Sequence, residues 1–533
     1  MRVAVAGGGP GGLFFATLLR RFDPSIKVTV FERDRADDTF GFGVVFSDRT
    51  LEGIHEADPV LRQALDAGGC HWDDIEVRLK GERIRCGGNG MAAIVRTTLL
   101  HLLQERAVAL GADLRFSKEV TLDDLGDYDL VVAADGTGSR IREQVADYLE
   151  VTVETSEVKF IWFGTDYLFD GLTFVHEHGP HGAFAVHGYP ISDSVSTFIV
   201  EADEATWRRA GLDEFDVTQT PGPSDMRTKE YLQGLFANQI DGRELLVNNS
   251  RWSNFVTRRT RPWHVFAPQP VAFLGDAVHT AHFSVGSGTK MAMEDAVALA
   301  SAVAEHKDDM EAAFGEYERT ARPPVERVQD AARPSLSWWE RFSIYHDAFE
   351  PWQFAYHFLT RSISDSRLER RDPSFVTSSH KAWHDSFGYS PLGTPIRHGG
   401  WSTPGRVATV VEKAGVPVSL TADGTPLPLL TEGVDSGQWG GLVEAPEDEA
   451  GLTAARAELA SLANRNPNCL AVYGGVSLTR VLLTEEARFH YGLPSVLVDQ
   501  ELDRDKAVTA VLAGRTDLVG VTPEVAAEWD VTS

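Results

Sequence analysis

Short apolar runs at the start of the chain predict a strand, a helix and a second strand. Residues 3–6 are all apolar, residues 13–19 are apolar except for one threonine, and residues 27–31 alternate polar and apolar side chains. The glycine-rich residues 7–12 separate the first run from the second. A strand that passes through a tight turn into a helix, and then into another strand, is typical of a parallel α/β unit.

The glycine-rich turn predicts a phosphate-binding site. Gly7 would permit the turn, Gly9 would let a pyrophosphate approach the backbone, and Gly12 would let the helix pack on the strand. The pyrophosphate would lie at the positive N-terminus of the helix. Glu32 follows the second strand, where a carboxylate can bind a ribose hydroxyl. The order of elements favours a dinucleotide site over an ordinary loop, and we assign to it Gly7, Gly9, Gly11, Gly12, Glu32 and Arg33.

Two later strand patterns, residues 129–134 and 271–274, also run into glycine and aspartate. A third glycine-containing segment precedes the helical pattern of residues 291–299. Ligands of α/β sheets bind at the carboxyl ends of strands, although aspartate beside glycine is also common in ordinary turns. We favour ligand binding, and assign to the same site Asp135, Gly136, Gly275, Asp276, Gly286, Gly288 and Thr289.

Between these segments, residues 160–201 change to short runs rich in aromatic and β-branched side chains, separated by Gly, Pro, Asp and Ser. This pattern predicts an antiparallel sheet inserted into the nucleotide-binding fold. From about residue 390, four helix-then-strand repeats predict a parallel α/β unit. The helices of these repeats are expected at residues 406–412, 452–462, 485–491 and 506–512.

The fold class that follows is α/β. The predicted organisation is a discontinuous nucleotide-binding domain at residues 1–155 and 250–330, an antiparallel substrate domain at 156–249, a helical region at 331–388 and a C-terminal α/β domain at 389–533.

Composition narrows the possible partners. The 533 residues carry a net charge of −28, which opposes binding to nucleic acid or to an anionic membrane. No apolar stretch approaches the ~18 residues that a membrane span needs, and the N-terminus lacks the pattern of a signal peptide. The three cysteines have no metal-binding or CxxC spacing, so we expect a reducing cytoplasm, no structural disulfide and no metal.

The three glycine motifs, in this order, resemble those of the class A flavoprotein monooxygenases, the para-hydroxybenzoate hydroxylase-like family, over roughly residues 1–385. The resemblance implies a Rossmann-like FAD-binding domain in which the first glycine loop and Glu32 hold the ADP half of FAD. Asp276 would contact the ribityl chain, and Gly286 and Gly288 would lie against the isoalloxazine. Arg96 matches a family position that contacts FAD, and Asp135 with Gly136 would serve both flavin and nicotinamide.

Segments 41–46, 159–165 and 196–201 are similar to those of the group that contains salicylyl-CoA 5-hydroxylase and 2-aminobenzoyl-CoA monooxygenase, and more distantly to the indole hydroxylases of violacein synthesis. Two positions depart from the wider family: Phe283 stands where proline is usual, and Lys290 where asparagine is common.

The resemblance implies an enzyme that hydroxylates an aromatic ring with FAD, O2 and transient NADH or NADPH. A second strand-glycine-helix fingerprint is absent, which favours permanently bound FAD and a visiting nicotinamide. We expect His282 and Phe283 to contact substrate in the catalytic pocket, His279 to orient its loop, and His187 to be a core residue. The alternatives are a hydroxylase of a free aromatic or indole-type compound, a halogenase, or a flavin-binding protein without turnover; a homodimer is possible.

The substrate is expected to be a thioester. A free aromatic acid would need a buried cation for its carboxylate, and residues 160–201 contain no Arg or Lys. CoA phosphates could meet Arg208 and Arg209 or the basic run 258–261, although such runs are equally expected on a solvated face.

Residues 513–519 resemble the close of an old yellow enzyme barrel. About 140 residues remain from position 390, whereas a complete (β/α)₈ barrel takes about 250. Asp499 stands where that family binds the FMN phosphate, and a carboxylate would repel it. We therefore expect a truncated barrel domain without its own flavin, serving packing or association.

Overall fold

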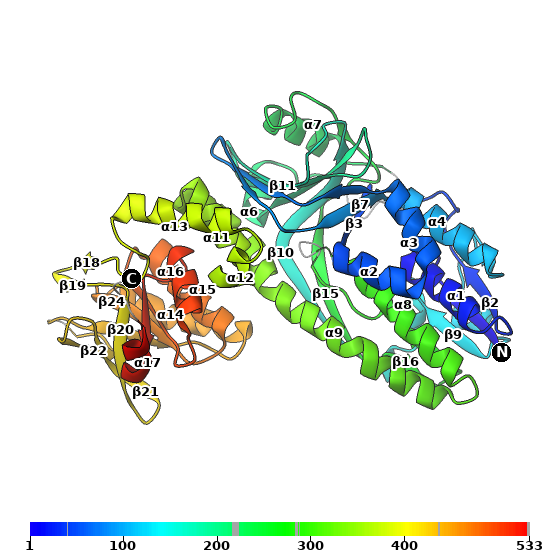
Figure 1. Ribbon diagram of the computed structural model, residues 1–533. Helices are drawn as coiled ribbons and strands as arrows, with labels where there is room; N and C mark the ends of the chain where they lie inside the picture. Colours follow the sequence, from blue (N-terminus) through cyan, green and yellow to red (C-terminus); the bar gives the residue numbers. More distant parts are fainter. Residues whose placement is uncertain (40, 216–222, 283–285, 287, 435–436, 530–533) are drawn as a thin grey trace. The chain divides into compact units, whose positions relative to one another are not determined.

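The computed structural model describes residues 1–39, 41–215, 223–282, 286, 288–434 and 437–529, and the chain divides into two compact units, Met1–Ser343 and Ile344–Ser533 (Figure 1). The predicted α/β fold class is confirmed.

The first unit is built on a sheet of order β16-β17-β9-β1-β2-β8. Its central strands are parallel and almost wholly buried, as expected for apolar runs that are covered on both faces. The strands are β1 (Arg2–Ala6), β2 (Lys27–Phe31), β8 (Asp113–Arg115), β9 (Leu130–Ala133), β16 (His264–Val265) and β17 (Val271–Phe273).

Helices α1 and α8 pack together beside this sheet, with α4 against α1 and α9 against α8 (Figure 1). The first helix is buried along most of its length because its apolar residues contact both the sheet and α8. The helices of the unit are α1 (Pro10–Phe22), α2 (Asp48–Ala57), α3 (Pro59–Gly68), α4 (Arg96–Ala109), α5 (Arg140–Gln144), α6 (Glu204–Arg209), α7 (Met226–Leu235), α8 (Gly288–Glu305) and α9 (Met310–Trp339).

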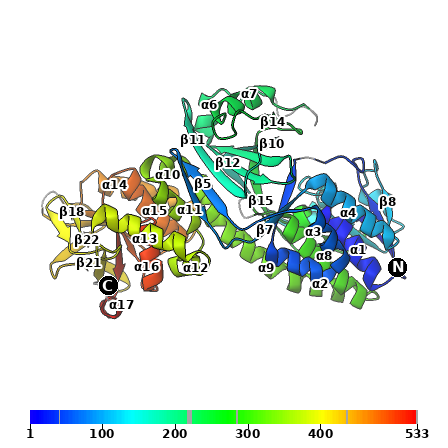
Figure 2. The same cartoon turned by 45° about the horizontal axis from the view of Figure 1, so that its top comes forward.

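The predicted inserted sheet is present, with order β14-β10-β13-β12-β11-β5-β6, and β15 pairs with β10. Helices α6 and α7 lie over one of its faces (Figure 2), where Phe198, Phe236 and their neighbours form a core. The strands are β5 (Ile75–Leu79), β6 (Glu82–Cys86), β10 (Glu150–Thr165), β11 (Leu172–Gly179), β12 (Gly182–Pro190), β13 (Ser196–Ala202), β14 (Leu245–Leu246) and β15 (Ser253–Arg261).

Strand β10 joins the two parts of the first unit. It pairs with β15 over residues 150–160 and with β13 over residues 159–165, so one strand belongs to a two-stranded ribbon and then to the inserted sheet. A smaller sheet of order β3-β7-β4 lies nearby and comprises β3 (Gly43–Ser47), β4 (Cys70–Trp72) and β7 (Met91–Val95).

The second unit contains helices and a closed barrel, β20 to β26 in sequence order, sealed by parallel pairing of β20 with β26. Strands β22 to β26 pair in parallel, whereas β20, β21 and β22 are antiparallel. The strands are β18 (Ile396–His398), β19 (Trp401–Thr403), β20 (Val407–Lys413), β21 (Val416–Thr421), β22 (Pro426–Leu430), β23 (Gly440–Glu444), β24 (Cys469–Tyr473), β25 (Ser495–Val498) and β26 (Leu518–Val521).

The helices of this part are α10 (Phe342–Ala348), α11 (Pro351–Leu359), α12 (Asp365–Glu369), α13 (Pro373–Phe387), α14 (Leu452–Ala463), α15 (Ser477–Phe489), α16 (Arg504–Leu512) and α17 (Pro523–Glu528).

One predicted element of the second unit is wrong. Residues 406–412 were expected to be helical, but residues 407–413 form β20, which turns back into β21. The turn consists of Ala414 and Gly415, both with positive φ, as a two-residue hairpin requires. The alternation of buried and accessible residues in β20, together with its valines, explains why a strand forms here.

Candidate functional site

The first glycine loop presents open space at one position and tight packing at the others. A Cβ at Gly7 would lie 2.2 Å from the Ala134 carbonyl oxygen, and a Cβ at Gly12 would lie 2.2 Å from the Gly7 carbonyl oxygen. A Cβ at Gly9 would have nothing within 4 Å, whereas one at Gly11 would meet Leu274 at 2.7 Å. The backbone at Gly9, directly before α1, therefore faces a space that a phosphate group can approach.

Glu32 connects this loop to the end of β2. Its carboxylate accepts hydrogen bonds from the backbone N–H of Gly8, at 2.7 Å, and of Asp34, at 2.9 Å. A carboxylate can accept further hydrogen bonds, so hydroxyl groups of a ligand can still bind there. Arg33 is exposed and lies 3.5 Å from Asp34.

The loop after β9 places a polar oxygen that is buried but unused. Asp135 accepts a hydrogen bond from the Ile141 backbone through Oδ2, while its Oδ1 is buried without a hydrogen-bond partner in the described part of the chain. Burial raises the pKa of this carboxyl group, although several hydrogen bonds oppose the shift. Gly136 has a positive φ, and a Cβ there would meet nothing within 4 Å. Such an orphaned acceptor beside open space suits a ligand donor.

Arg142 holds the second and third loops together. Its guanidinium donates to the carbonyl of Thr137 at 2.8 Å and to the carbonyl of Ala277 at 2.7 Å. Ser139 caps the short helix α5 by accepting from the Arg142 backbone. The ends of β9 and β17 are thereby fixed relative to each other.

Asp295, on the buried face of α8, orients the loop after β17. Its Oδ2 accepts from the Gly275 backbone at 2.8 Å and lies 2.7 Å from Nε2 of His279. Both side chains are buried. This arrangement supports an orienting role for His279. Sequence reasoning missed Asp295, although an acid on an otherwise apolar helix face is a detectable signal.

Asp276 sits among opposite charges while remaining open to a ligand. Asp276 is accessible to solvent, and the protein packed around it partly desolvates its carboxyl group and raises the pKa of that group. His279, Arg96 and Arg258 oppose the rise. Burial lowers the pKa of Arg96, whereas Asp276 and Tyr189 raise it. The structure thus brings Arg96 and Asp276 together, although they are 180 residues apart in the numbering.

The segment before α8 is described only in part. His282 is buried, with its ring edge-on to Phe255 at 5.0 Å, whereas Phe283 lies outside the described residues. A Cβ at Gly286 or at Gly288 would meet nothing within 4 Å. Thr289 is half-buried in the first turn of α8, and Lys290 pairs with Glu294 at 2.7 Å.

One face of the inserted sheet forms an aromatic wall, which we define as Phe160, Trp162, Tyr189 and Ile199. Directly paired residues share a face, and the register pairs Trp162 with Ile199 and Ile199 with His187. The wall packs with Phe42 and Val45 in an apolar cluster. Phe160 and Trp162 remain partly accessible.

These features fit FAD. The site carries open glycine positions at Gly9, Gly136, Gly286 and Gly288, a helix N-terminus for a pyrophosphate, and carboxylates that can accept from ribose or ribityl hydroxyls. The buried orphan oxygen of Asp135 gives one such acceptor. The aromatic wall provides apolar surface suited to a flat ring.

The basic groups considered for CoA phosphates are already paired. Arg208 bonds Glu204 at 2.6 Å, Arg259 bonds Asp330 at 2.8 Å and Arg261 bonds Glu326 at 2.6 Å. Arg209 donates to the His181 carbonyl. These pairings favour a solvated face for these four arginines, whereas Arg258 faces the candidate cofactor site and donates to the carbonyl of Asp276 at 3.4 Å.

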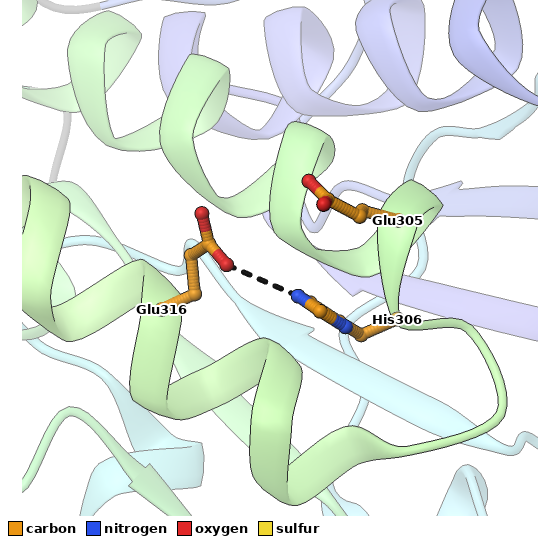
Figure 3. Close-up of side chains that lie close together, drawn as sticks. All are labelled: Glu305, His306 and Glu316. Carbon is orange, nitrogen blue, oxygen red and sulfur yellow. Dashed lines mark hydrogen bonds and ion pairs between the residues drawn. The ribbon is translucent and has the colours of Figure 1, made fainter.

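A further group of possible metal ligands lies where α8 leads into α9 (Figure 3). Glu305, His306 and Glu316 come close together, and His306 Nε2 is 3.0 Å from Glu316. Glu305 is exposed, so the group is understood as a surface link between the helices. In the second unit, Arg480 bonds Asp499 at 2.7 Å and also donates to the carbonyls of Gly474 and Gly475.

Comparisons with known proteins agree with this geometry. A family model described as "FAD binding domain" matches residues 1–128 and 126–332. Salicyloyl-CoA 5-hydroxylase of Streptomyces sp is 54% identical over 98% of this chain and all of that protein. The 3-hydroxy-4-methyl-anthranilyl-[aryl-carrier protein] 5-monooxygenase of Streptosporangium sibiricum is 36% identical over 64% of this chain and 90% of that protein.

Among solved structures, 2-methyl-3-hydroxypyridine-5-carboxylic acid oxygenase matches with a TM-score of 0.52 at 20% identity, covering 66% of this chain and 96% of that one. This likeness supports the fold alone. The helices that the structure describes include none that is long and apolar enough to cross a membrane.

Proposed function

Since this chain belongs to the FAD-binding-domain family of class A flavoprotein monooxygenases, we propose that it hydroxylates the ring of an aromatic acyl-CoA. The proposed substrate is salicyloyl-CoA (salicylyl-CoA), with the new hydroxyl at ring position 5, as in the name of the full-length relative. The proposed co-substrates are O2 and NADH or NADPH.

FAD, when bound, accepts electrons from the nicotinamide and uses O2 to transfer one oxygen atom to the ring. We propose that the backbone at Gly9 and the N-terminus of α1 bind its pyrophosphate, and that Glu32 binds a ribose hydroxyl. Asp276 would bind the ribityl chain beside Arg96. Asp295, His279 and Arg142 would hold these loops in place before the cofactor arrives.

The observation that supports a thioester substrate over a free acid is the aromatic wall, whose four residues are uncharged. Residues 160–201 contain no Arg or Lys; Arg96, which lies beside Tyr189, also faces Asp276 and is proposed to serve FAD. Burying a free carboxylate against such a surface would cost several kcal/mol without a partner, whereas a thioester is neutral. The wall can therefore receive the ring and acyl group of a thioester while excluding the free acid.

The test offers purified protein salicylate and salicyloyl-CoA, and anthranilate and its CoA thioester, with NADH and NADPH in parallel. We expect the thioesters to give products one oxygen atom heavier, with kcat/KM roughly tenfold or more above that of the free acids. Mass analysis of product and nicotinamide oxidation measure this. Equal or faster turnover of the free acids would contradict the proposal, and hydroxylation of indole compounds alone would favour the alternative.

Further parts of the proposal concern the whole protein. We propose a cytoplasmic location, which the free thiols of Cys70, Cys86 and Cys469 support, and a homodimer that light scattering on purified protein can test. We also propose that residues 156–249 act as the substrate domain and residues 389–533 as a barrel domain without flavin chemistry of its own.

A further inference from the structure

A buried acid adjoins the aromatic wall. Glu201 lies on β13, directly paired with Phe160 of β10 and Ala185 of β12, and its side chain is fully buried. Its Oε1 lies 2.5 Å from Nε2 of His187, whereas its Oε2 is buried without a hydrogen-bond partner in the ranges that the structure describes. Leaving a buried carboxylate oxygen unpaired costs free energy, which a purely structural role does not explain.

One imidazole, that of His187, contacts this acid, that of His282 is near enough to affect it electrostatically, and His176 of β11 lies on the same face, because it pairs with Ala185, the partner of Glu201. His187 comes from β12, and His282 comes from the segment that leads to α8. Burial raises the pKa of Glu201 to about 7, and His282 opposes the rise. Strand β10 adds the uncharged Phe160, and α9 adds Trp339, whose ring is 4.3 Å from that of His187. Both protonation states of Glu201 are therefore accessible near neutral pH.

The register shows how this group meets the substrate surface. Ile199, two residues before Glu201, faces Trp162, so the acid is the next position along the same face. His282 lies edge-on to Phe255 and directly precedes the segment that enters α8 at Gly288. The sequence prediction of His187 as a core residue is correct in its burial, but it missed the acid that His187 binds.

Resting on the proposed function, we propose that His187 and Glu201 are positioning residues for His282, and that the three side chains take up the phenolic proton of the bound substrate before oxygen is transferred. The O–H bond breaks, the electron pair stays on the phenolic oxygen, and the proton passes to His282 and on towards Glu201. The ring becomes more electron-rich at the carbon opposite that oxygen. After oxygen transfer, driven by NAD(P)H and O2 through FAD, the hydroxylated carbon loses its hydrogen as a proton. The phenolic oxygen then recovers a proton from His282.

The first experiment compares Glu201→Gln with a matched control, Glu177→Gln. Glu177 lies on β11 of the same sheet, where it accepts a hydrogen bond from Gln239. We expect Glu201→Gln to lower the hydroxylation kcat by on the order of 10²-fold and to remove its pH transition near neutrality. FAD content and FAD reduction by NAD(P)H should match the wild type, and Glu177→Gln should behave as wild type throughout. An unchanged rate and pH profile in Glu201→Gln would overturn the relay.

A second experiment varies the acidity of the phenolic hydroxyl group of the substrate. A substrate with a fluorine beside the hydroxyl is a stronger acid, so it should lose less rate in Glu201→Gln and in His187→Gln than the parent substrate does. Equal losses for both substrates would contradict proton uptake and indicate a packing role.

A third experiment uses only the wild-type protein, so its result does not depend on whether a variant folds. Infrared difference spectra of the wild type should show a protonated-carboxyl band that grows when a phenolic substrate binds, and its absence would overturn the proposal. If the wild type hydroxylates no phenolic substrate, the proposed function fails and the relay fails with it. That result is observed in the wild type alone, so the two failures are distinguishable.

Discussion

At the scale of single residues, the glycines of the first loop differ in why a side chain is absent: packing excludes it at two positions, and open space lies beside a third. Gly7 and Gly12 are excluded from carrying a side chain by the carbonyl oxygens of Ala134 and Gly7, whereas Gly9 faces open space. The first two therefore serve the fold, and Gly9 is free to serve the ligand.

This difference predicts contrasting effects of two alanine substitutions. Gly12→Ala should destabilise the flavin-free protein by about 1–3 kcal/mol, because its Cβ would meet backbone that cannot yield. Gly9→Ala should change that stability by less than about 0.5 kcal/mol, since Gly9 has φ −74° and open space, but should weaken FAD binding tenfold or more. Thermal melting of the flavin-free protein and fluorescence titration with FAD measure the two effects. Parallel behaviour of the variants would refute the assignment.

The site residues that the sequence predicted belong to local motifs, whereas those it missed act through contacts with residues distant in the sequence. Gly9, Glu32 and Asp276 stand in local patterns of strand, glycine and acid, which a single sequence displays. Asp295 and Glu201 matter because the fold brings them to Gly275 and His187. Their partners lie on other elements, so local spacing does not reveal these contacts; an acid on an apolar helix face marks Asp295 as unusual but does not identify its partner.

At the scale of elements, the second unit depends on a buried polar cluster. His357 of α11 lies 3.1 Å from Glu485 of α15, whose other oxygen accepts from Tyr345 of α10 at 2.6 Å. All three side chains are buried. Burial lowers the pKa of His357 to about 4, against an ordinary value of 6.5.

The second unit should therefore lose stability in mild acid. Between pH 6.5 and about pH 4 the unfolded chain binds a proton that folded His357 does not, so stability falls as pH falls through this window, by up to about 3 kcal/mol. Hydrogen exchange of peptides from residues 344–529 in the full chain measures this. His357→Gln should flatten the dependence, whereas His380→Gln, at a half-exposed histidine of the same unit, should not. A dependence that persists in His357→Gln would assign it to other groups.

The helices and strands also show which elements can be predicted from the hydrophobic pattern and which cannot. The inserted antiparallel sheet and the later helices of the second unit were predicted correctly from periodicity. The helix expected at residues 406–412 is β20, because its pairing with β21 and β26 decides the outcome. A short apolar run such as Val407–Lys413 is ambiguous without those partners.

At the scale of the whole molecule, the barrel of the second unit closes although the sequence is too short for a full (β/α)₈ barrel. Asp499, which the sequence resemblance aligns with an FMN phosphate site, pairs with Arg480, and Arg480 also donates to two carbonyls. The Arg480 guanidinium and the Asp499 carboxylate therefore already neutralise each other at this position.

Flavin extraction should accordingly release FAD and no FMN. The expected ratio is about one FAD per chain, since one dinucleotide fingerprint is present. Chromatography of flavin from protein incubated with both cofactors measures this, and stoichiometric FMN would show that the second unit is a flavin domain after all.

The long strand β10 has a consequence for motion within the first unit. Its residues pair first with β15 and then with β13, with a register shift between Thr155 and Lys159, so the β10–β15 ribbon continues directly into the inserted sheet. A hinge within this ribbon would have to break backbone hydrogen bonds, so we expect slow opening there to be disfavoured. Substrate entry and product release would then depend on movements of side chains and short connections, which occur in nanoseconds to microseconds. We therefore expect local rearrangements, and not the motion of a whole domain, to set the pace of turnover.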